Sequence, residues 1–186
     1  MLVKEIIKKV LNYTGNYELS NAIESGEYTT TQQRDIDLLV DCINLTNSNI
    51  ATNYVKLIKS KKVQNSTGII SYSKVTNEMI FNIISVTTSG GEKVNFTVKN
   101  DGIETKKGEV IIKYSYFPAD VQLEDSILIY PTKVNERIFV FGVISEYYYA
   151  KGVFDEAQIW EEKFKLEMRN IMRTPTCRII KKRRWV

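Results

Sequence analysis

The sequence predicts an α+β protein in which helices at both ends of the chain flank a central antiparallel β region. Apolar residues recur at steps of three and four along the first and last thirds of the chain. Between them, apolar and polar residues alternate in short runs that are separated by turn-forming residues, as in antiparallel strands. We therefore expect a helical bundle, made of a long helix and C-terminal helices, with an inserted antiparallel β-meander and a basic C-terminal tail.

The N-terminal part carries three helical patterns. Val3 to Asn12 has its apolar residues on one helical face, and a short helix is expected from Glu18 to Ile23. From Thr30 to Lys59 an apolar stripe runs along a helix of about eight turns, interrupted once at Asn47. Hydroxyl groups from Thr29 onward supply an N-terminal cap for this long helix.

The β region is expected to begin after the long helix and to end at Pro118, which cannot donate to a strand ladder. Gly90 and Gly91 form one expected turn, and Asn100-Asp101-Gly102 forms another. The expected strands are 69–73, 81–86, 94–98 and 110–116.

Helical periodicity returns from about Val134 and is strongly apolar as far as Tyr148. Gly152 interrupts it, and a charged amphipathic helix then runs from about Asp155 to a stop at Thr174-Pro175. The predicted organisation is a helical domain formed by 1–65 and 119–174, an inserted β subdomain at 66–118, and a basic tail at 175–186.

The positive charge is concentrated at the C-terminus. The chain has 26 basic and 22 acidic residues, and 173–186 contains six basic residues and no acid. The remaining 20 basic and 22 acidic residues make the body of the chain close to neutral. No apolar run approaches the roughly 18 residues of a membrane span, and Met1 to Glu5 do not resemble a secretory signal, so we expect a protein kept in the cytoplasm.

Several classes of catalytic and metal site lack their residues. The chain has no histidine, which excludes His-based zinc sites and Ser-His or Cys-His nucleophile pairs. Cys42 and Cys177 are far apart, which predicts neither a disulfide framework nor a zinc site, and Cys42 is expected to be buried. The run from Ser89 to Lys93 lacks the Ser or Thr that follows the lysine of a phosphate-binding loop, and a hairpin turn is the better interpretation. We expect no enzymatic activity, no cofactor and no metal.

Two other clusters have a structural and a functional interpretation. Asp37 and Asp41 share a helical face that Asp35 does not, and a solvated face is favoured over a metal-dependent nuclease site. The aromatic run Tyr147–Tyr149 could stack on nucleic-acid bases, but its side chains point in different directions along a helix. Packing in the core is therefore favoured for at least one of these tyrosines.

The tail is the segment with the most specific partner chemistry. It combines basic residues with apolar and aromatic ones, which favours docking into a groove of a protein partner. Contact with a nucleic-acid backbone and an ordinary solvated end are the two alternatives. The candidate docking residues are Arg178, Ile179, Ile180, Lys181, Lys182, Arg183, Arg184 and Trp185.

Several strings, taken in this order, resemble the head–tail adaptor proteins of tailed bacteriophages, the group that includes tail tubular protein A and the connector rings under the portal. The strings are Gln33–Leu39, Glu109–Pro118 followed by Glu124-Asp125, Phe141–Tyr147 leading into Phe154–Phe164, and Lys181–Trp185. The similarity covers most of the chain loosely and contains no catalytic signature, so it bears on fold more than on function.

The resemblance implies a structural virion protein of the head–tail junction, made in the host cytoplasm, with no membrane contact. It implies a homo-oligomeric ring, commonly of twelve subunits, that joins the portal protein to tail or nozzle proteins. Genomic DNA would pass through its lumen without sequence-specific binding, for which a near-neutral body is suited. The alternative hypotheses are a nucleic-acid-binding module that uses the basic tail, and a hydrolase that uses only carboxylates and lysines.

Overall fold

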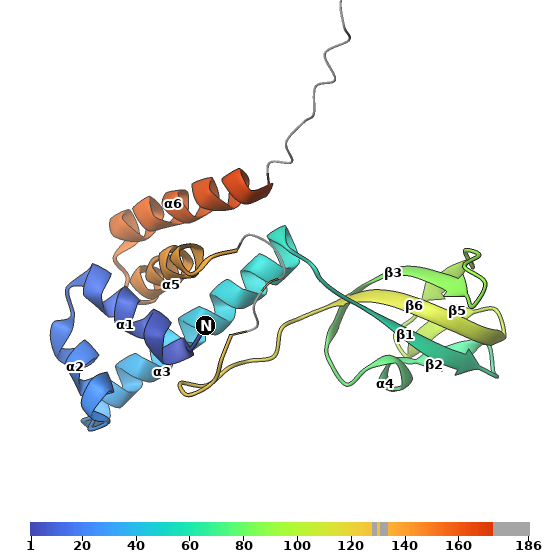
Figure 1. The fold of residues 1–186 in the computed structure, drawn as a ribbon, viewed down its shortest axis with the longest axis horizontal. Helices are drawn as coiled ribbons and strands as arrows, with labels where there is room; N and C mark the ends of the chain where they lie inside the picture. Colours follow the sequence, from blue (N-terminus) through green and yellow to red (C-terminus); the bar gives the residue numbers. More distant parts are fainter. Residues whose placement is uncertain (128–129, 131–133, 173–186) are drawn as a thin grey trace, which may run out of the picture.

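The computed structural model describes residues 1–127, 130 and 134–172. The chain is α+β and has two lobes that lie side by side along its long axis (Figure 1). The helices are α1 (Val3–Thr14), α2 (Tyr17–Ser25), α3 (Thr30–Asn49), a π-helical turn η1 (Ile50–Tyr54), α4 (Tyr72–Val75), α5 (Glu136–Ala150) and α6 (Phe154–Met172). The strands are β1 (Leu57–Asn65), β2 (Ile69–Ser71), β3 (Ile80–Thr88), β4 (Phe96–Val98), β5 (Gly102–Thr105) and β6 (Gly108–Tyr116).

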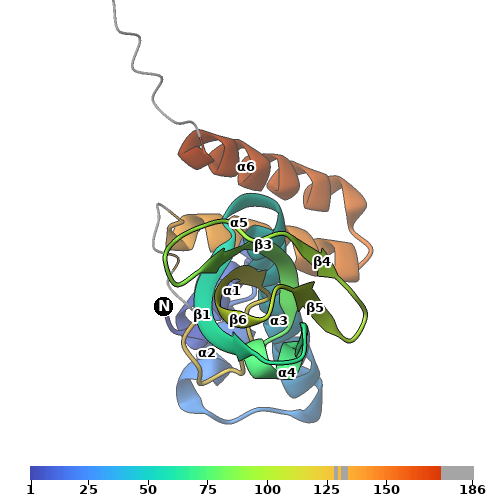
Figure 2. The same cartoon turned by 90° about the vertical axis from the view of Figure 1, so that its right-hand side faces the viewer.

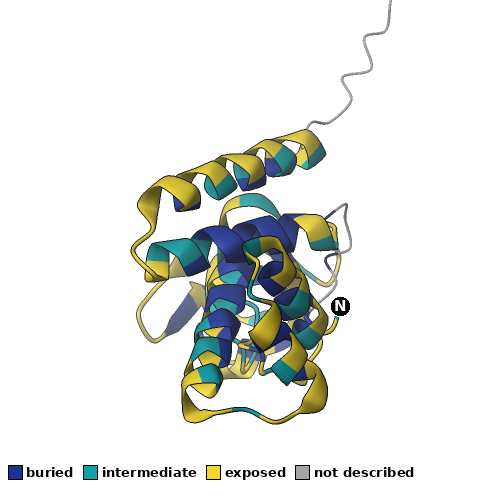
Figure 3. Ribbon diagram, turned by 90° about the vertical axis from the view of Figure 1, so that its left-hand side faces the viewer, coloured by how far each residue is buried: buried dark blue, intermediate teal, exposed yellow. Residues whose placement is uncertain are grey.

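Helix α5 occupies the centre of the helical lobe, because α1, α3 and α6 all pack against it (Figure 3). Every residue from Ile138 to Ser145 is buried. This explains why the α5 sequence is apolar all round instead of carrying a single stripe. Helices α1, α3 and α6 each keep a charged outer face and contribute one apolar stripe to the core. None of the helices in the described part is long and apolar enough to cross a membrane.

Local capping chemistry sets the helix ends. The Thr29 hydroxyl accepts from the Gln32 amide at 3.2 Å, and the Gln32 side chain accepts from the Thr29 amide at 2.9 Å, which starts α3 with a capping box. Gly152 adopts φ 75° between α5 and α6, which confirms the predicted interruption there.

The long helix ends earlier than the sequence predicted. Helix α3 stops at Asn49, η1 adds one turn, and Leu57 already begins β1, so the prediction of a helix up to Lys59 was wrong for its last residues. The apolar pair at Leu57 and Ile58 fits the helical stripe, but Leu57 instead lies opposite Tyr116 of β6. The first strand therefore falls inside the 1–65 segment that we had assigned to helices.

The strands do not follow the predicted meander order. They form two three-stranded antiparallel sheets, β1-β6-β3 and β2-β5-β4, so β6 pairs with two strands that are distant in sequence (Figure 2). The second sheet includes β5, which was not predicted. Gly102 permits its pairing with β2, since a Cβ atom there would lie 2.3 Å from the Ile70 carbonyl oxygen.

Side chains of α3 hold the segment that returns from the β lobe. The Asn44 amide group donates to the Val121 carbonyl and accepts from the Val121 amide at 3.2 and 2.9 Å. The buried Tyr130 hydroxyl donates to the Asn47 side chain at 2.7 Å. Asn47 is the polar residue that interrupts the apolar stripe of α3, and its side chain accepts the hydrogen bond that this buried hydroxyl needs.

Helices α3, α5 and α6 meet closely at Gly142. A Cβ atom at this position would lie 2.5 Å from Thr46 Cγ2 and 3.2 Å from a ring carbon of Phe164. The Thr46 hydroxyl is buried and has no hydrogen-bond partner among the described residues. This contact makes Gly142 a packing requirement within a helix, where glycine is otherwise unfavourable.

We expect Gly142→Ala to lower the free energy of unfolding by about 1–3 kcal/mol, because overpacking outweighs the gain of about 1 kcal/mol in helix propensity. The same substitution should cost clearly less in a Thr46→Ala background, where the methyl group that it meets is gone. Urea unfolding of the four proteins of this double-mutant cycle measures the difference. An equal cost in both backgrounds would contradict the predicted contact.

Cys42 is buried, as the sequence predicted, and removal from water raises the pKa of its thiol to about 12, with smaller contributions from Glu146 and Asp41. In a Cys177→Ser variant at pH 8, Cys42 should therefore react with a thiol reagent only when the protein unfolds. Rapid labelling under native conditions would contradict the packing of α3. The labelling rate in denaturant serves as the control.

Candidate protein-binding groove

Three aromatic side chains from three helices meet on the surface of the helical lobe. Tyr13 lies in the last turn of α1, Phe141 lies on α5, and Trp160 lies on α6. They meet because α1 and α6 both pack against α5. The ring centroids are 5.8 Å apart for Tyr13 and Trp160, 6.5 Å for Tyr13 and Phe141, and 5.4 Å for Phe141 and Trp160. The two Tyr13 contacts are edge-to-face, a favourable geometry for aromatic pairs.

The three rings differ in their exposure. Phe141 is only 5% exposed and belongs to the core, whereas Trp160 is partly buried and Tyr13 is 59% exposed. The cluster thus leads from the hydrophobic core to the surface. Large aromatic side chains that stay exposed at such a place are available for contact with another molecule.

Two cations lie over these rings. The Arg137 guanidinium lies 5.0 Å from the centre of the Phe141 ring, and the Lys163 ammonium lies 3.8 Å from that of Trp160. Arg137 also approaches a Glu167 carboxylate oxygen at 3.7 Å. The cation–π contacts hold long side chains over the aromatic surface, which lowers the entropy that they would lose on binding a partner.

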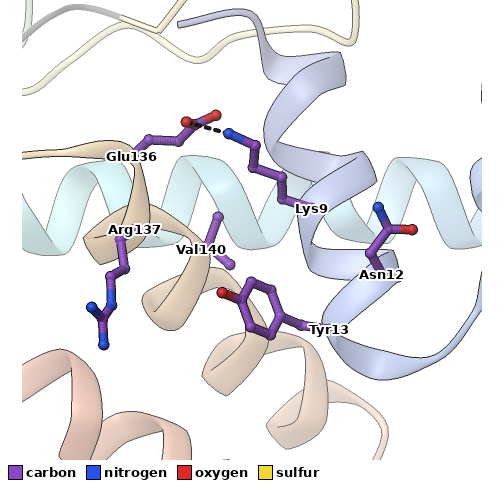
Figure 4. Close-up of a pocket in the computed structure, with 6 residues that line it drawn as sticks. All are labelled: Lys9, Asn12, Tyr13, Glu136, Arg137 and Val140. Atoms are coloured by element: carbon purple, nitrogen blue, oxygen red, sulfur yellow. Dashed lines mark hydrogen bonds and ion pairs between the residues drawn. The ribbon is translucent and has the colours of Figure 1, made fainter.

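The aromatic cluster separates two adjoining hollows. One, of about 370 Å³, lies between α1 and the start of α5, where Lys9 pairs with Glu136 (Figure 4). The other, of about 320 Å³, lies between α5 and α6, and Tyr13 and Arg137 line both. We call this surface the α1/α5/α6 groove; its defining residues are Tyr13, Arg137, Phe141, Trp160, Lys163 and Leu166.

The composition of the groove suits protein recognition. Tyrosine, tryptophan and arginine are the residues that most often dominate binding energy at protein interfaces. Leu166, which is 56% exposed, adds an aliphatic side chain at the rim. Within the described ranges, no group of three or more His, Cys, Asp or Glu residues is placed to hold a metal ion.

The aspartates of α3 do not form a cluster. Asp37 and Asp41 are exposed, and Asp37 accepts a hydrogen bond from Gln33, as expected of a solvated face. Asp35 is half-buried and pairs with Lys151 at the end of α5 over 2.6 Å. That hydrogen bond raises the pKa of Lys151 and links the start of α3 to the end of α5.

The structure confirms packing for the tyrosine run and a turn for the Gly90-Gly91 segment. Tyr147 is buried, and its two neighbours are half-buried on α5. The Gly91 amide donates to the Thr88 carbonyl at 2.9 Å, and the Thr88 amide donates to the Glu92 carbonyl at 2.8 Å, which forms a hairpin turn. The predicted docking residues of the tail lie outside the described residues; they are Arg178, Ile179, Ile180, Lys181, Lys182, Arg183, Arg184 and Trp185.

Comparisons with protein-family models and with curated proteins found no match.

Sequence reasoning missed the groove. Neither Tyr13 nor Arg137 was singled out by the helical patterns. Periodicity identifies the apolar face of each helix but not which two faces meet at their edges. Tyr13, a large aromatic residue at the end of the α1 stripe, was the one available signal.

We expect Tyr13→Ala to lower the free energy of unfolding by only about 1 kcal/mol, because the ring is largely exposed and loses mainly two edge-to-face contacts. Phe141→Ala, the buried counterpart from the same cluster, should cost about 3–5 kcal/mol. Chemical unfolding of both variants measures the contrast. Equal losses in the free energy of unfolding would mean that Tyr13 stabilises the fold and would contradict its role in binding a partner.

Proposed function

We propose that this chain is a structural protein of a tailed bacteriophage, an adaptor that forms a ring at the head–tail junction. The proposal includes the finer architecture, in which a helical bundle carries the inserted β lobe. It also includes docking of the C-terminal segment 175–186 on the portal protein and contact of the ring with phage tail or nozzle proteins on its other side. DNA would pass through the lumen of the ring. The sequence resemblance suggested this assembly, commonly of twelve subunits.

The observation that carries the proposal is the presence of two unlike exposed apolar surfaces on different lobes. One is the α1/α5/α6 groove. The other, which we call the β3 patch, consists of Met79, Phe81, Val98 and Phe117, and Met79 is 72% exposed. Phe81 and Phe117 pack edge to face at 5.3 Å within this patch.

Two unlike surfaces are what a ring requires. Each subunit of a ring contacts one neighbour with one surface and the other neighbour with a different surface, whereas a symmetric dimer uses the same surface twice. Each lobe has its own hydrophobic core, and the most exposed side chains of the two surfaces, Tyr13 and Met79, are not among its buried residues. These features support heterologous assembly.

Negative-stain electron microscopy of the concentrated protein, with light scattering on the same sample, tests the proposal. We expect closed rings whose channel is wide enough for duplex DNA. The variant Tyr13→Glu/Leu166→Glu should prevent ring formation, because it places two charges in the groove. A native protein that stays monomeric at every concentration would contradict the proposal.

A matched control is available on the same lobe. Tyr17 and Leu45 are 62% and 58% exposed, and neither belongs to the groove. The variant Tyr17→Glu/Leu45→Glu changes the same residue types and the same charge, and it should still form rings. Loss of rings in both variants would mean that added charge, and not the groove, controls assembly.

A further inference from the structure

The near-neutral body consists of two lobes of opposite charge. Residues 56–118, which contain the β lobe, include ten lysines and five acids, a net charge of +5. Residues 1–55 and 119–172 include ten basic and 17 acidic residues, a net charge of −7. The six remaining basic residues lie in 173–186. The predicted neutrality is therefore a sum of opposite charges that the fold places in different lobes.

Three lysines of the β lobe line one cleft. Lys59 and Lys61 are two residues apart on β1, so both side chains point to the same face of the sheet. Lys74, which also lines the cleft, comes from α4. The cleft has a volume of about 510 Å³, and its other lining residues are Ser60, Ser73, Val75, Thr76, Asn77, Glu78 and Tyr114. We call it the lysine cleft.

Among the described residues, one of the three ammonium groups is paired with a carboxylate. Lys59 pairs with Glu78 at 2.6 Å, which raises the pKa of the lysine, and it also lies 4.6 Å from the centre of the Tyr116 ring. Lys61 and Lys74 form no ion pair within the part of the chain that the structure describes. The cleft thus keeps two uncompensated positive charges, surrounded by hydroxyl and amide groups that can donate hydrogen bonds.

Protection of a sheet edge does not account for this arrangement. Lysines on an edge strand discourage pairing with other chains, and β1 is an edge strand. That role accounts for Lys59 and Lys61 on β1, but it does not account for Lys74, which lines the same cleft from α4.

The choice of lysine points to a phosphate ligand. The β lobe has ten lysines and no arginine. Protein interfaces are enriched in arginine and depleted in lysine, while a lysine ammonium is a compact charge well suited to a phosphate oxygen. A surface of lysines without arginine also lacks the planar donors that read base edges.

We propose that the lysine cleft binds the phosphate backbone of duplex DNA without sequence preference. This inference goes beyond ring formation and does not depend on it, because a single subunit already contains the cleft. It also differs from DNA binding by the C-terminal tail, since the two basic surfaces belong to different segments.

The test measures binding of a fluorescent DNA duplex to the full chain as a function of salt concentration. The contribution of the C-terminal tail to DNA binding is removed by five substitutions, Arg178→Gln, Lys181→Gln, Lys182→Gln, Arg183→Gln and Arg184→Gln. All further variants are made in this background. We expect Lys61→Gln/Lys74→Gln to weaken binding and to reduce the slope of log K against log salt by about two, roughly one per phosphate contact. The charge-conserving Lys61→Arg/Lys74→Arg should retain the affinity.

Lys106→Gln/Lys107→Gln is the matched control. These two exposed lysines lie between β5 and β6 in the same lobe, outside the lysine cleft, and their loss changes the net charge equally. We expect this control to bind like its background. The proposal would be overturned if both pairs of substitutions weakened DNA binding equally, or if the protein bound no DNA at low salt. It would also be overturned if polyglutamate displaced the labelled duplex as strongly as unlabelled DNA does, a result that would favour an acidic protein partner.

Discussion

The burial of α5 on all sides is the constraint on which the rest of the structure depends. Because its buried run leaves no solvated face, three other helices must pack against it. Two of them, α3 and α6, approach Gly142 so closely that a Cβ atom does not fit there. This arrangement brings the edges of α1 and α6 together over Phe141. The α1/α5/α6 groove is therefore a consequence of how the core is covered.

Hydrogen bonds of α3 hold the segment that returns from the β lobe against this core. Asn44 makes two part-buried hydrogen bonds to the Val121 backbone. Asn47 accepts from the buried Tyr130 hydroxyl, which an apolar residue at this position would leave without that partner. The two lobes keep separate hydrophobic cores, which lets them carry opposite charges and unlike exposed surfaces. In the assembly that we propose, neighbouring subunits and a polyanion would contact different parts of one chain.

Much of the fold was predictable because it depends on interactions between residues that are close in the sequence. The apolar faces of α1, α3 and α6, the turn at Gly90-Gly91 and the interruption at Gly152 follow from periodicity and backbone preference. The end of α3 was not predictable from the sequence. Leu57 fits a helical stripe and a strand equally well, and only its pairing with Tyr116 shows that it belongs to a strand. The order of strands around β6, and the meeting of Tyr13 with Trp160, depend on contacts between distant segments that one sequence does not reveal.

The chain is proposed to assemble through unlike surfaces into a closed ring. Sedimentation velocity over a wide range of protein concentrations tests it most directly. We expect one discrete large species beside the monomer, because a heterologous interface that closes into a ring leaves no free end. A dimer that does not grow further, or a continuous series of sizes, would contradict it.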